Sequence, residues 1–266
     1  MGDIMVPTLE NICAIHTRLE PQGSNALLAG LDRGDRSALL ALATRENLSL
    51  GDVLCATGRT PSALWFPISG CIAEYKEHPD GRALRVAITG REGASPIPSV
   101  LAERPSATST VCFSHGVAVR LAREHLTTLV AQRSSLLQSL LALSARQTVG
   151  AYQSAFCNAF HSVDQRVARW MLETAQSLGS TILHTTQEAV ALDLGVQRSS
   201  IVAAFKGLKA EHLVRHTRGD LRIRNLDGLR KKSCGCEAHM STENDRLSAL
   251  KAVRLHHMPF ALDGTE

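Results

Sequence analysis

Arg198, Ser199 and Lys206 share one side of a predicted helix and are suited to bind a polyanion through hydrogen bonds and charge. Four apolar residues at helical spacing define the side of that helix that is buried: Ile201, Ala204, Phe205 and Leu208. The second helix of a helix-turn-helix presents such a polar face, near its N-terminal end, to the major groove of DNA. The spacing therefore predicts a surface that contacts DNA.

The preceding residues supply the rest of such a motif. Thr185 or Thr186 is suited to cap a first helix, because a threonine hydroxyl accepts a hydrogen bond from a free backbone N–H at that position. Gly195 stands where two helices that meet at a steep angle need a residue tolerant of positive φ. An ordinary pair of antiparallel helices has the same features, so this pattern alone leaves both interpretations open.

A short alternating run and an excess of basic residues follow the two predicted helices. The run RHTRGDLRIRNL alternates around Gly219 and Asp220, as a β-hairpin does. A hairpin directly after a helix-turn-helix is the winged form of the motif. Lys and Arg also outnumber Asp and Glu over residues 161–232. Positive charge suits a polyanionic partner, so these neighbours favour double-stranded DNA as the ligand.

The whole chain, with 266 residues and a formal net charge of +4, is long enough for two ordinary domains. No apolar run is long enough to cross a bilayer, and the N-terminal residues lack the basic start and apolar core of a signal peptide. We therefore expect a cytoplasmic protein without membrane contacts. The seven cysteines are scattered and odd in number, which argues against a disulfide framework.

Residues 50–121 consist of short apolar runs separated by turn residues. The candidate strands come in this order: VLCATG, ALWFPI, CIAEYKE, ALRVAIT, TSTVCF and VAVRLA. Glycine-containing turns such as Ser69-Gly70 and His115-Gly116 separate them. Several short strands at such spacing predict an antiparallel sandwich or jelly roll.

A long helix is predicted over residues 134–160. Two sets of residues along it have the spacing of one helical face: Leu136, Leu140 and Leu143, then Val149, Tyr152, Phe156 and Ala159. Such spacing is typical of a helix packed lengthwise on another helix, as in a homodimer. Packing against the chain's own β domain would produce the same pattern, and the two are compatible.

These elements together predict an α+β fold with an N-terminal antiparallel β-roll (jelly roll), a long dimerisation helix and a C-terminal winged helix-turn-helix. The predicted segments are a lead-in at 1–34, the β-roll sensor domain at 35–132, the linker helix at 133–160, the winged helix-turn-helix at 161–232 and a tail at 233–266. The tail is polar and irregular, which is typical of disorder.

A β-roll, a long helix and a winged helix-turn-helix in this order resemble the Crp/Fnr family of bacterial transcription regulators. The resemblance covers about residues 35–236. It depends most on GDVL, PISGCI and DGR in the roll, and on HSVDQRVARWML and TTQEAVALDLGVQRSSIVAAFKGLKAEHLV after it. It implies a cyclic-nucleotide-binding-like domain and a homodimer on an inverted-repeat operator. It also allows RNA polymerase as a further partner.

The resemblance assigns roles to individual residues. Arg198 matches the arginine that reads guanine in the major groove, and Gln197 and Ser199 beside it complete the expected base-reading group. Phosphate contacts, which position a protein without reading sequence, are implied at Thr186, Ser200, Lys206 and Arg218. Ser199 and Ala203 stand where the best-known members carry a glutamate and often an arginine, so a different operator sequence is expected.

The effector pocket departs from the family pattern. Cyclic-nucleotide binders of the family carry a glycine–glutamate pair for the ribose and, further along, an arginine–serine pair for the phosphate. Arg104 and Ser106 are the nearest counterparts of the second pair, but Pro105 separates them and no acid stands at residues 94–96. Because a buried phosphate needs a charged partner and an oriented ribose, we expect an effector other than cyclic AMP.

No bound cofactor is predicted. Cys13 is the only cysteine near the start of the chain, so the N-terminal iron–sulfur cluster of some family members has no ligand set here. Haem ligation would depend on single histidines such as His78, His115 and His125, which as isolated residues are more often polar surface positions.

A run of metal-binding residue types occurs near the C-terminal end, where Cys234, Cys236 and His239 form Cys-x-Cys-x-x-His. A thiol switch or a metal site is one interpretation, and an inherited feature of a family subgroup with a similar tail is the other. Structural zinc sites usually have two-residue spacing and four ligands, so we predict no metal site from this run.

Catalysis is not predicted, since no nucleotide-cradling glycine loop, nucleophile elbow or His-Glu-x-x-His pattern occurs. The alternative to a DNA-binding transcription regulator is a small-molecule or redox/metal-sensing module in which the helix-turn-helix is only structural. A DNA reader must bind more weakly as salt rises, because counterions are released on binding, and this separates the two classes.

Overall fold

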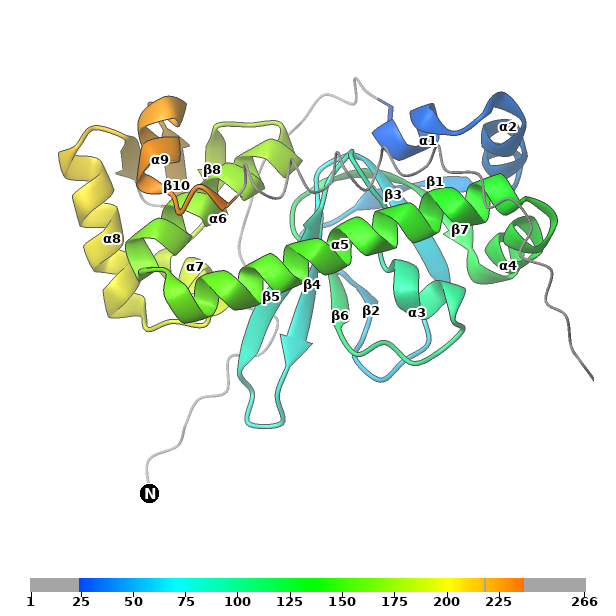
Figure 1. The fold of residues 1–266 in the computed structure, drawn as a ribbon, viewed down its shortest axis with the longest axis horizontal. Coiled ribbons are helices and arrows are strands. Elements are labelled where there is room, and N and C mark those ends of the chain that lie inside the picture. The colour runs from blue at the N-terminus through cyan, green and yellow to red at the C-terminus, as the bar shows by residue number, and fades with distance from the viewer. Residues whose placement is uncertain (1–23, 218, 237–266) are drawn as a thin grey trace, which may run out of the picture.

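The computed structural model describes residues 24–217 and 219–236. A β-roll and a winged helix-turn-helix lie at opposite ends of the molecule, and helix α5 (Ser134–Phe160) runs along both (Figure 1). The predicted order of elements is therefore confirmed, and α5 has the predicted bounds. The predicted disordered tail lies outside the described residues except for 233–236. Among the described helices, none is long and apolar enough to span a membrane.

Two antiparallel sheets form the roll, with strand orders β1-β7-β3 and β2-β6-β4-β5. The strands are β1 (Thr44–Leu48), β2 (Val53–Cys55), β3 (Ala63–Ser69), β4 (Ile72–Glu77), β5 (Ala83–Thr89), β6 (Ser109–Cys112) and β7 (Gly116–Ala122). All of them except β1 match the predicted runs. The sequence TRENL of β1 is mostly polar because this edge strand pairs with β7 through its backbone and buries only Leu48.

Helices pack against the β1-β7-β3 sheet. They are α1 (Ala26–Gly30), α2 (Arg33–Leu42), α3 (Ile97–Leu101), α4 (Arg123–Gln132) and the N-terminal half of α5. Their buried side chains share one core with β3 and β7, which includes Leu28, Leu39, Leu64, Phe66, Leu121, Leu136, Leu140 and Leu143. The three α5 leucines thus pack on the chain's own β domain, and α1 from the predicted lead-in belongs to the same core.

The C-terminal domain consists of α6 (Val163–Leu178), β8 (Ile182–His184), α7 (Gln187–Leu194), α8 (Arg198–Ala210), β9 (Val214–Thr217), β10 (Asp220–Ile223) and α9 (Leu226–Lys232). Thr186 caps α7, since its hydroxyl accepts a hydrogen bond of 3.1 Å from the Ala189 N–H. Gly195 ends α7 with φ of 61°, the left-handed conformation predicted for the turn.

The predicted hairpin is present, but its turn lies one residue earlier than the sequence suggested. Asp220 pairs with Thr217, so Gly219 lies in the turn and Asp220 does not. Gly219 has φ of 86°, which suits a turn position, whereas Asp220 is already in a strand. β10 also pairs with β8, which gives the order β8-β10-β9. β8, with three residues, is too short to show a periodic pattern.

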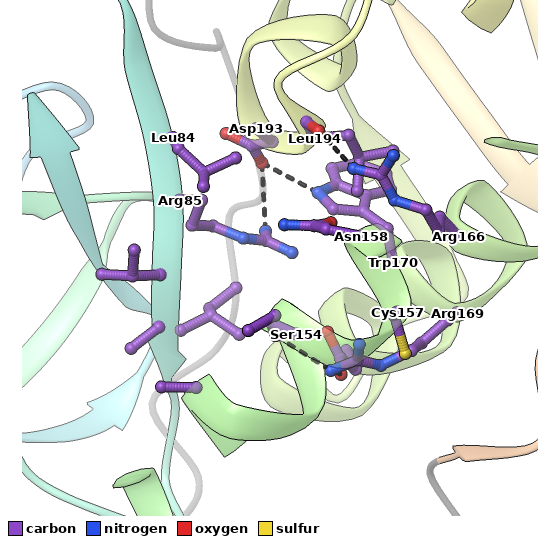
Figure 2. Close-up of a pocket in the computed structure, with 16 residues that line it drawn as sticks. Leu84, Arg85, Ser154, Cys157, Asn158, Arg166, Arg169, Trp170, Asp193 and Leu194 are labelled. Carbon is purple, nitrogen blue, oxygen red and sulfur yellow. Dashed lines mark hydrogen bonds and ion pairs between the residues drawn. The ribbon is translucent and has the colours of Figure 1, made fainter. Parts of the chain in front are cut away.

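A buried polar network joins the C-terminal domain to the roll. Asp193 of α7 lies 3.1 Å from the Arg85 guanidinium of β5, and both side chains are almost fully buried (Figure 2). The same carboxylate accepts hydrogen bonds from the Trp170 indole at 2.8 Å and the Tyr75 hydroxyl at 2.9 Å. Burial raises the pKa of Asp193, and these three partners act in the opposite direction.

Replacing Asp193→Ala leaves the Arg85 guanidinium buried without its carboxylate. Loss of one partner from a buried ion pair costs about 3–5 kcal/mol, so the free energy of unfolding in urea is expected to fall by about that amount. Asp227→Ala is a matched control, because its pair with Arg230 is exposed on both sides and is worth at most about 1 kcal/mol. Equal losses in the two variants would show that the network does not stabilise the domain junction.

Candidate nucleic-acid interface

The first turn of α8 is exposed and carries the residues predicted to read bases. Gln197 precedes the helix and makes no side-chain capping hydrogen bond, and Arg198 and Ser199 follow it. The Arg198 side chain is 64% exposed and lies 3.6 Å from the Glu188 carboxylate of α7, itself 73% exposed. A solvated pair of this kind contributes little, so the guanidinium can exchange Glu188 for another partner.

The opposite side of α8 packs on the domain core, as the spacing predicts. Its buried residues are Ile201, Ala204, Phe205 and Leu208. Val202, Ala203 and Lys206 remain exposed. Lys206 comes eight residues after Arg198, which corresponds to about 12 Å along the helix axis. The two cations therefore occupy the same exposed surface at different distances from the helix N-terminus.

Two predicted phosphate-binding residues lie at helix N-termini, where free N–H groups and the helix dipole attract anions. The Thr186 hydroxyl accepts the capping hydrogen bond of α7 and retains its own proton for donation. Ser200 is half-buried in the first turn of α8. Arg218, the remaining predicted contact besides Lys206, lies outside the described residues.

The hairpin packs beside α8 and adds basic side chains to the same domain. The Phe205 ring contacts the His216 ring, with centroids 5.4 Å apart. Burial and then the charge of Lys209 lower the pKa of His216, so this residue serves as a neutral packing group. Arg215, Arg222 and Arg224 are exposed on the hairpin and directly after it.

A model of the Crp-like helix-turn-helix domain matches residues 165–232, which span α6 to α9. The chain is also similar to the CRP-like cAMP-activated global transcriptional regulator of Mycobacterium tuberculosis. The two are 26% identical over 188 residues, which cover 66% of this chain and 84% of the relative. Residues 165–232 therefore match a Crp-like helix-turn-helix domain, and the longer match is to a CRP-like transcription regulator.

Solved structures share the fold of this chain. A putative Crp/Fnr transcriptional regulator from Eubacterium rectale superimposes with a TM-score of 0.62 at 17% identity, covering 77% of this chain and 97% of that chain. FixK2 from Bradyrhizobium japonicum also gives 0.62, at 14% identity, and covers 72% and 98%. Both comparisons extend over the roll, the long helix and the C-terminal domain together.

Two adjoining cavities lie between strand β5 of the roll and helices α5 and α6. One, of about 230 Å³, lies between β5, α5 and α6, and its lining includes Arg85, Arg166, Arg169 and Trp170 (Figure 2). The other, of about 250 Å³, includes Glu92, Arg146 and Gln147. The two share residues of β5 and the α5 residue Ser154. Arg104 and Ser106 line neither cavity.

The predicted effector residues do not converge. Arg104 is exposed, whereas Ser106 is buried and its hydroxyl lies 3.3 Å from that of Thr108. Thr108 in turn donates to the Glu74 carboxylate of β4 at 3.0 Å, and the Ser95 hydroxyl donates to the same carboxylate at 2.7 Å. The polar groups near Ser106 thus bind one another, and Arg104 is exposed.

Four metal-binding side chains meet at the far end of α5. Cys234 and Cys236 join Cys157 and His161, and the potential ligand atoms of all four lie within 4.8 Å of one another. Burial raises the pKa of Cys157, but hydrogen bonds from Gln153 and His161 outweigh it and lower that pKa to about 7.

Cys157 and His161 were not predicted as metal ligands, because the whole C-terminal domain separates them from the Cys-x-Cys run in the sequence. Their separation of four positions, at the end of a predicted helix, was the one available signal. His239, which the sequence placed with this run, lies outside the described residues. The predicted haem candidates lie on separate elements. His78 is beside Asp80 in the turn after β4, His115 accepts a hydrogen bond from the Leu50 N–H, and His125 is exposed on α4.

Proposed function

We propose that this protein regulates transcription as a Crp/Fnr-type homodimer that reads an inverted-repeat operator through the first turn of α8. The observation that carries the proposal is the exposure of Arg198 on a supported, amphipathic second helix of a winged helix-turn-helix. The helix N-terminus and the basic hairpin beside it provide the positive surface that DNA binding requires.

Base reading and backbone contact are divided along α8. A side chain in the first turn reaches the base edges, and the fork of Arg198 fits O6 and N7 of guanine. Lys206, about 12 Å further along the helix, is placed for the flanking phosphates. Thr186 and Ser200 add phosphate contacts at the two helix N-termini. Gln197 and Ser199 complete the reading surface, and because Ser199 is short, the operator differs from that of members with glutamate there.

The homodimer is proposed from the exposed face of α5. Large apolar side chains stand exposed on it: Leu141 at 53%, Tyr152 at 70%, Phe156 at 50% and Phe160 at 72%. Leu141 and Tyr152 lie on one face, opposite the buried leucines of the same helix, and Phe156 and Phe160 continue that face. A second copy of α5 is the fitting occupant, because reading two half-sites about 34 Å apart needs two copies of α8.

Cyclic AMP is not the effector in this proposal. The curated relative from Mycobacterium tuberculosis is named as cAMP-activated. In this chain, however, Arg104 is exposed, and Ser106 lies in a set of hydroxyls directed at Glu74. A carboxylate in that position disfavours a phosphate, and no arginine is directed toward it.

Substituting Arg198→Ala is expected to weaken binding to the cognate operator by about 1–3 kcal/mol and to leave binding to unrelated DNA almost unchanged. Lys206→Ala is the matched control on the same face. It should weaken both kinds of binding alike and reduce the slope of log K against log salt by about one unit. Fluorescence anisotropy with an operator selected from bound genomic fragments provides the measurement. Equal losses on both DNAs for Arg198→Ala would assign it to phosphate and move base reading to Gln197, Ser199 or Ser200.

Substituting Phe156→Asp places a charge in the proposed helix–helix interface and is expected to yield a monomer in sedimentation equilibrium. The same variant should lose affinity for a full inverted repeat while its affinity for a single half-site is retained. Ala131→Asp is the control, since it adds an equal charge at an exposed position on α4 instead of α5. A dimer that persists in Phe156→Asp would contradict the assignment of this face.

Cyclic AMP is expected to leave the melting temperature of the protein unchanged at any concentration. A ligand present at a hundred times its dissociation constant would stabilise the folded state by about 2.7 kcal/mol, which a thermal scan detects easily. A rise in melting temperature that grows with cyclic AMP concentration would show that the roll binds the nucleotide after all.

A further inference from the structure

The cluster of Cys157, His161, Cys234 and Cys236 unites two distant segments of the chain. Cys157 lies in the last turn of α5 and His161 directly follows this helix, whereas Cys234 and Cys236 follow α9. The Sγ atoms of Cys157 and Cys234 are 3.7 Å apart, and Sγ of Cys236 lies 3.8 Å from Nδ1 of His161. Cys157 also lines the cavity beside Arg85, whereas His161, Cys234 and Cys236 line neither of the two cavities described above.

We propose that these three thiolates and one imidazole bind a single Zn²⁺ ion. Zinc binds sulfur at about 2.3 Å and imidazole nitrogen at about 2.0–2.1 Å in a tetrahedron, so two sulfurs lie about 3.8 Å apart and a sulfur and a nitrogen about 3.6 Å apart. The two observed separations have these lengths. The largest separation in the set, within 4.8 Å, requires only a small closure of the ligands.

The ligand types select the kind of metal. Three sulfurs and a nitrogen suit zinc, whereas calcium and magnesium bind oxygen ligands. A four-iron cluster is disfavoured by the short distances, because each of its protein ligands binds a different iron atom and the ligands must stand further apart. Four protein ligands close the coordination sphere, which is typical of a structural rather than a catalytic zinc site.

The backbone turn and the neighbouring side chains orient the four potential ligands. Gly235, between the two C-terminal cysteines, has φ of 70°, and this turn brings the two thiols closer together than an extended strand, in which residues two apart share a face but lie about 6.6–6.8 Å apart. The His161 ring packs edge-on against Phe156, with centroids 5.6 Å apart. Gln153 donates a hydrogen bond of 3.4 Å to Sγ of Cys157. Such surrounding contacts orient metal ligands.

A buried arginine, which is ion-paired with Glu173 at 2.6 Å, lies beside the site. Three thiolates and one Zn²⁺ carry a net charge of −1, and the buried Arg169 interacts with Cys157. The bound ion would link the end of α5 to the end of the C-terminal domain. It would thereby hold α6 to α9 in one orientation relative to the proposed dimer helix. This regulatory consequence depends on the proposed function, whereas zinc binding itself does not.

Metal analysis of the full-length protein, purified under reducing conditions without chelator, tests the site. About one zinc per chain is expected, and Co²⁺ in place of zinc should show the strong visible absorption of a tetrahedral thiolate site. Cys234→Ser and His161→Ala should bind Co²⁺ more than about tenfold more weakly, since losing a ligand is at least as costly as losing a supporting contact. Cys55→Ser, at a buried thiol in β2 far from the set, is the control that keeps full binding.

Three results would overturn the zinc site: no zinc and no cobalt spectrum in folded, reduced protein, iron with acid-labile sulfide instead of zinc, or equal binding by Cys234→Ser and Cys55→Ser. Circular dichroism confirms that each variant is folded. The regulatory consequence has its own test, in which zinc removal should weaken binding to an inverted repeat more than to a single half-site. Zinc binding with unchanged DNA affinity would reject that consequence and keep the site. Failure to bind any DNA would reject the proposed function and leave the zinc content valid.

Discussion

The carboxylate of Asp193 is the point on which the arrangement of the two domains depends. It is buried between Arg85 and Tyr75 of the roll and Trp170 of α6, each of which offers it a hydrogen bond or a charge. Burial raises the pKa of Asp193, and the Arg85 charge opposes this effect. Because Arg85 belongs to the roll and Asp193 to α7, the ion pair requires contact between the two domains. The Arg85 guanidinium also lies 5.3 Å from the ring centroids of Phe113 and Trp170, which ties the same charge to the hydrophobic core.

The contact between α7 and β5 determines which face of α8 remains exposed. The first helix of the motif is used for contact with the roll, and α8 is left with a free outer face. The cavity bordered by Arg85, Asp193 and Arg166 lies at this same junction (Figure 2). The charges that join the C-terminal domain to the roll therefore also line this cavity.

Local signals in the sequence were sufficient for most of the fold. The apolar spacing of residues 134–160 gave α5 its bounds, and Thr186 and Gly195 marked the beginning and end of α7. Strands that are held mainly by backbone pairing with a neighbouring strand were harder to predict from the sequence. β1 is mostly polar, and β8 is too short to show a pattern. Contacts between distant residues left no signal at all. Nothing near Arg85 or Asp193 indicates the other, and Cys157 resembles an ordinary helical cysteine until the fold brings Cys234 beside it.

The last turns of α5 contribute residues both to the thiol cluster and to the proposed dimer face. Cys157 directs its thiol inward to Cys234, while the neighbouring Phe156 exposes its ring on the proposed dimer face and also packs against His161. Adjacent residues on a helix point about 100° apart, so one rigid turn can hold both groups only in a fixed relation. The helix end thus places the chain's C-terminal thiols and the surface proposed for its partner on adjacent residues of one turn.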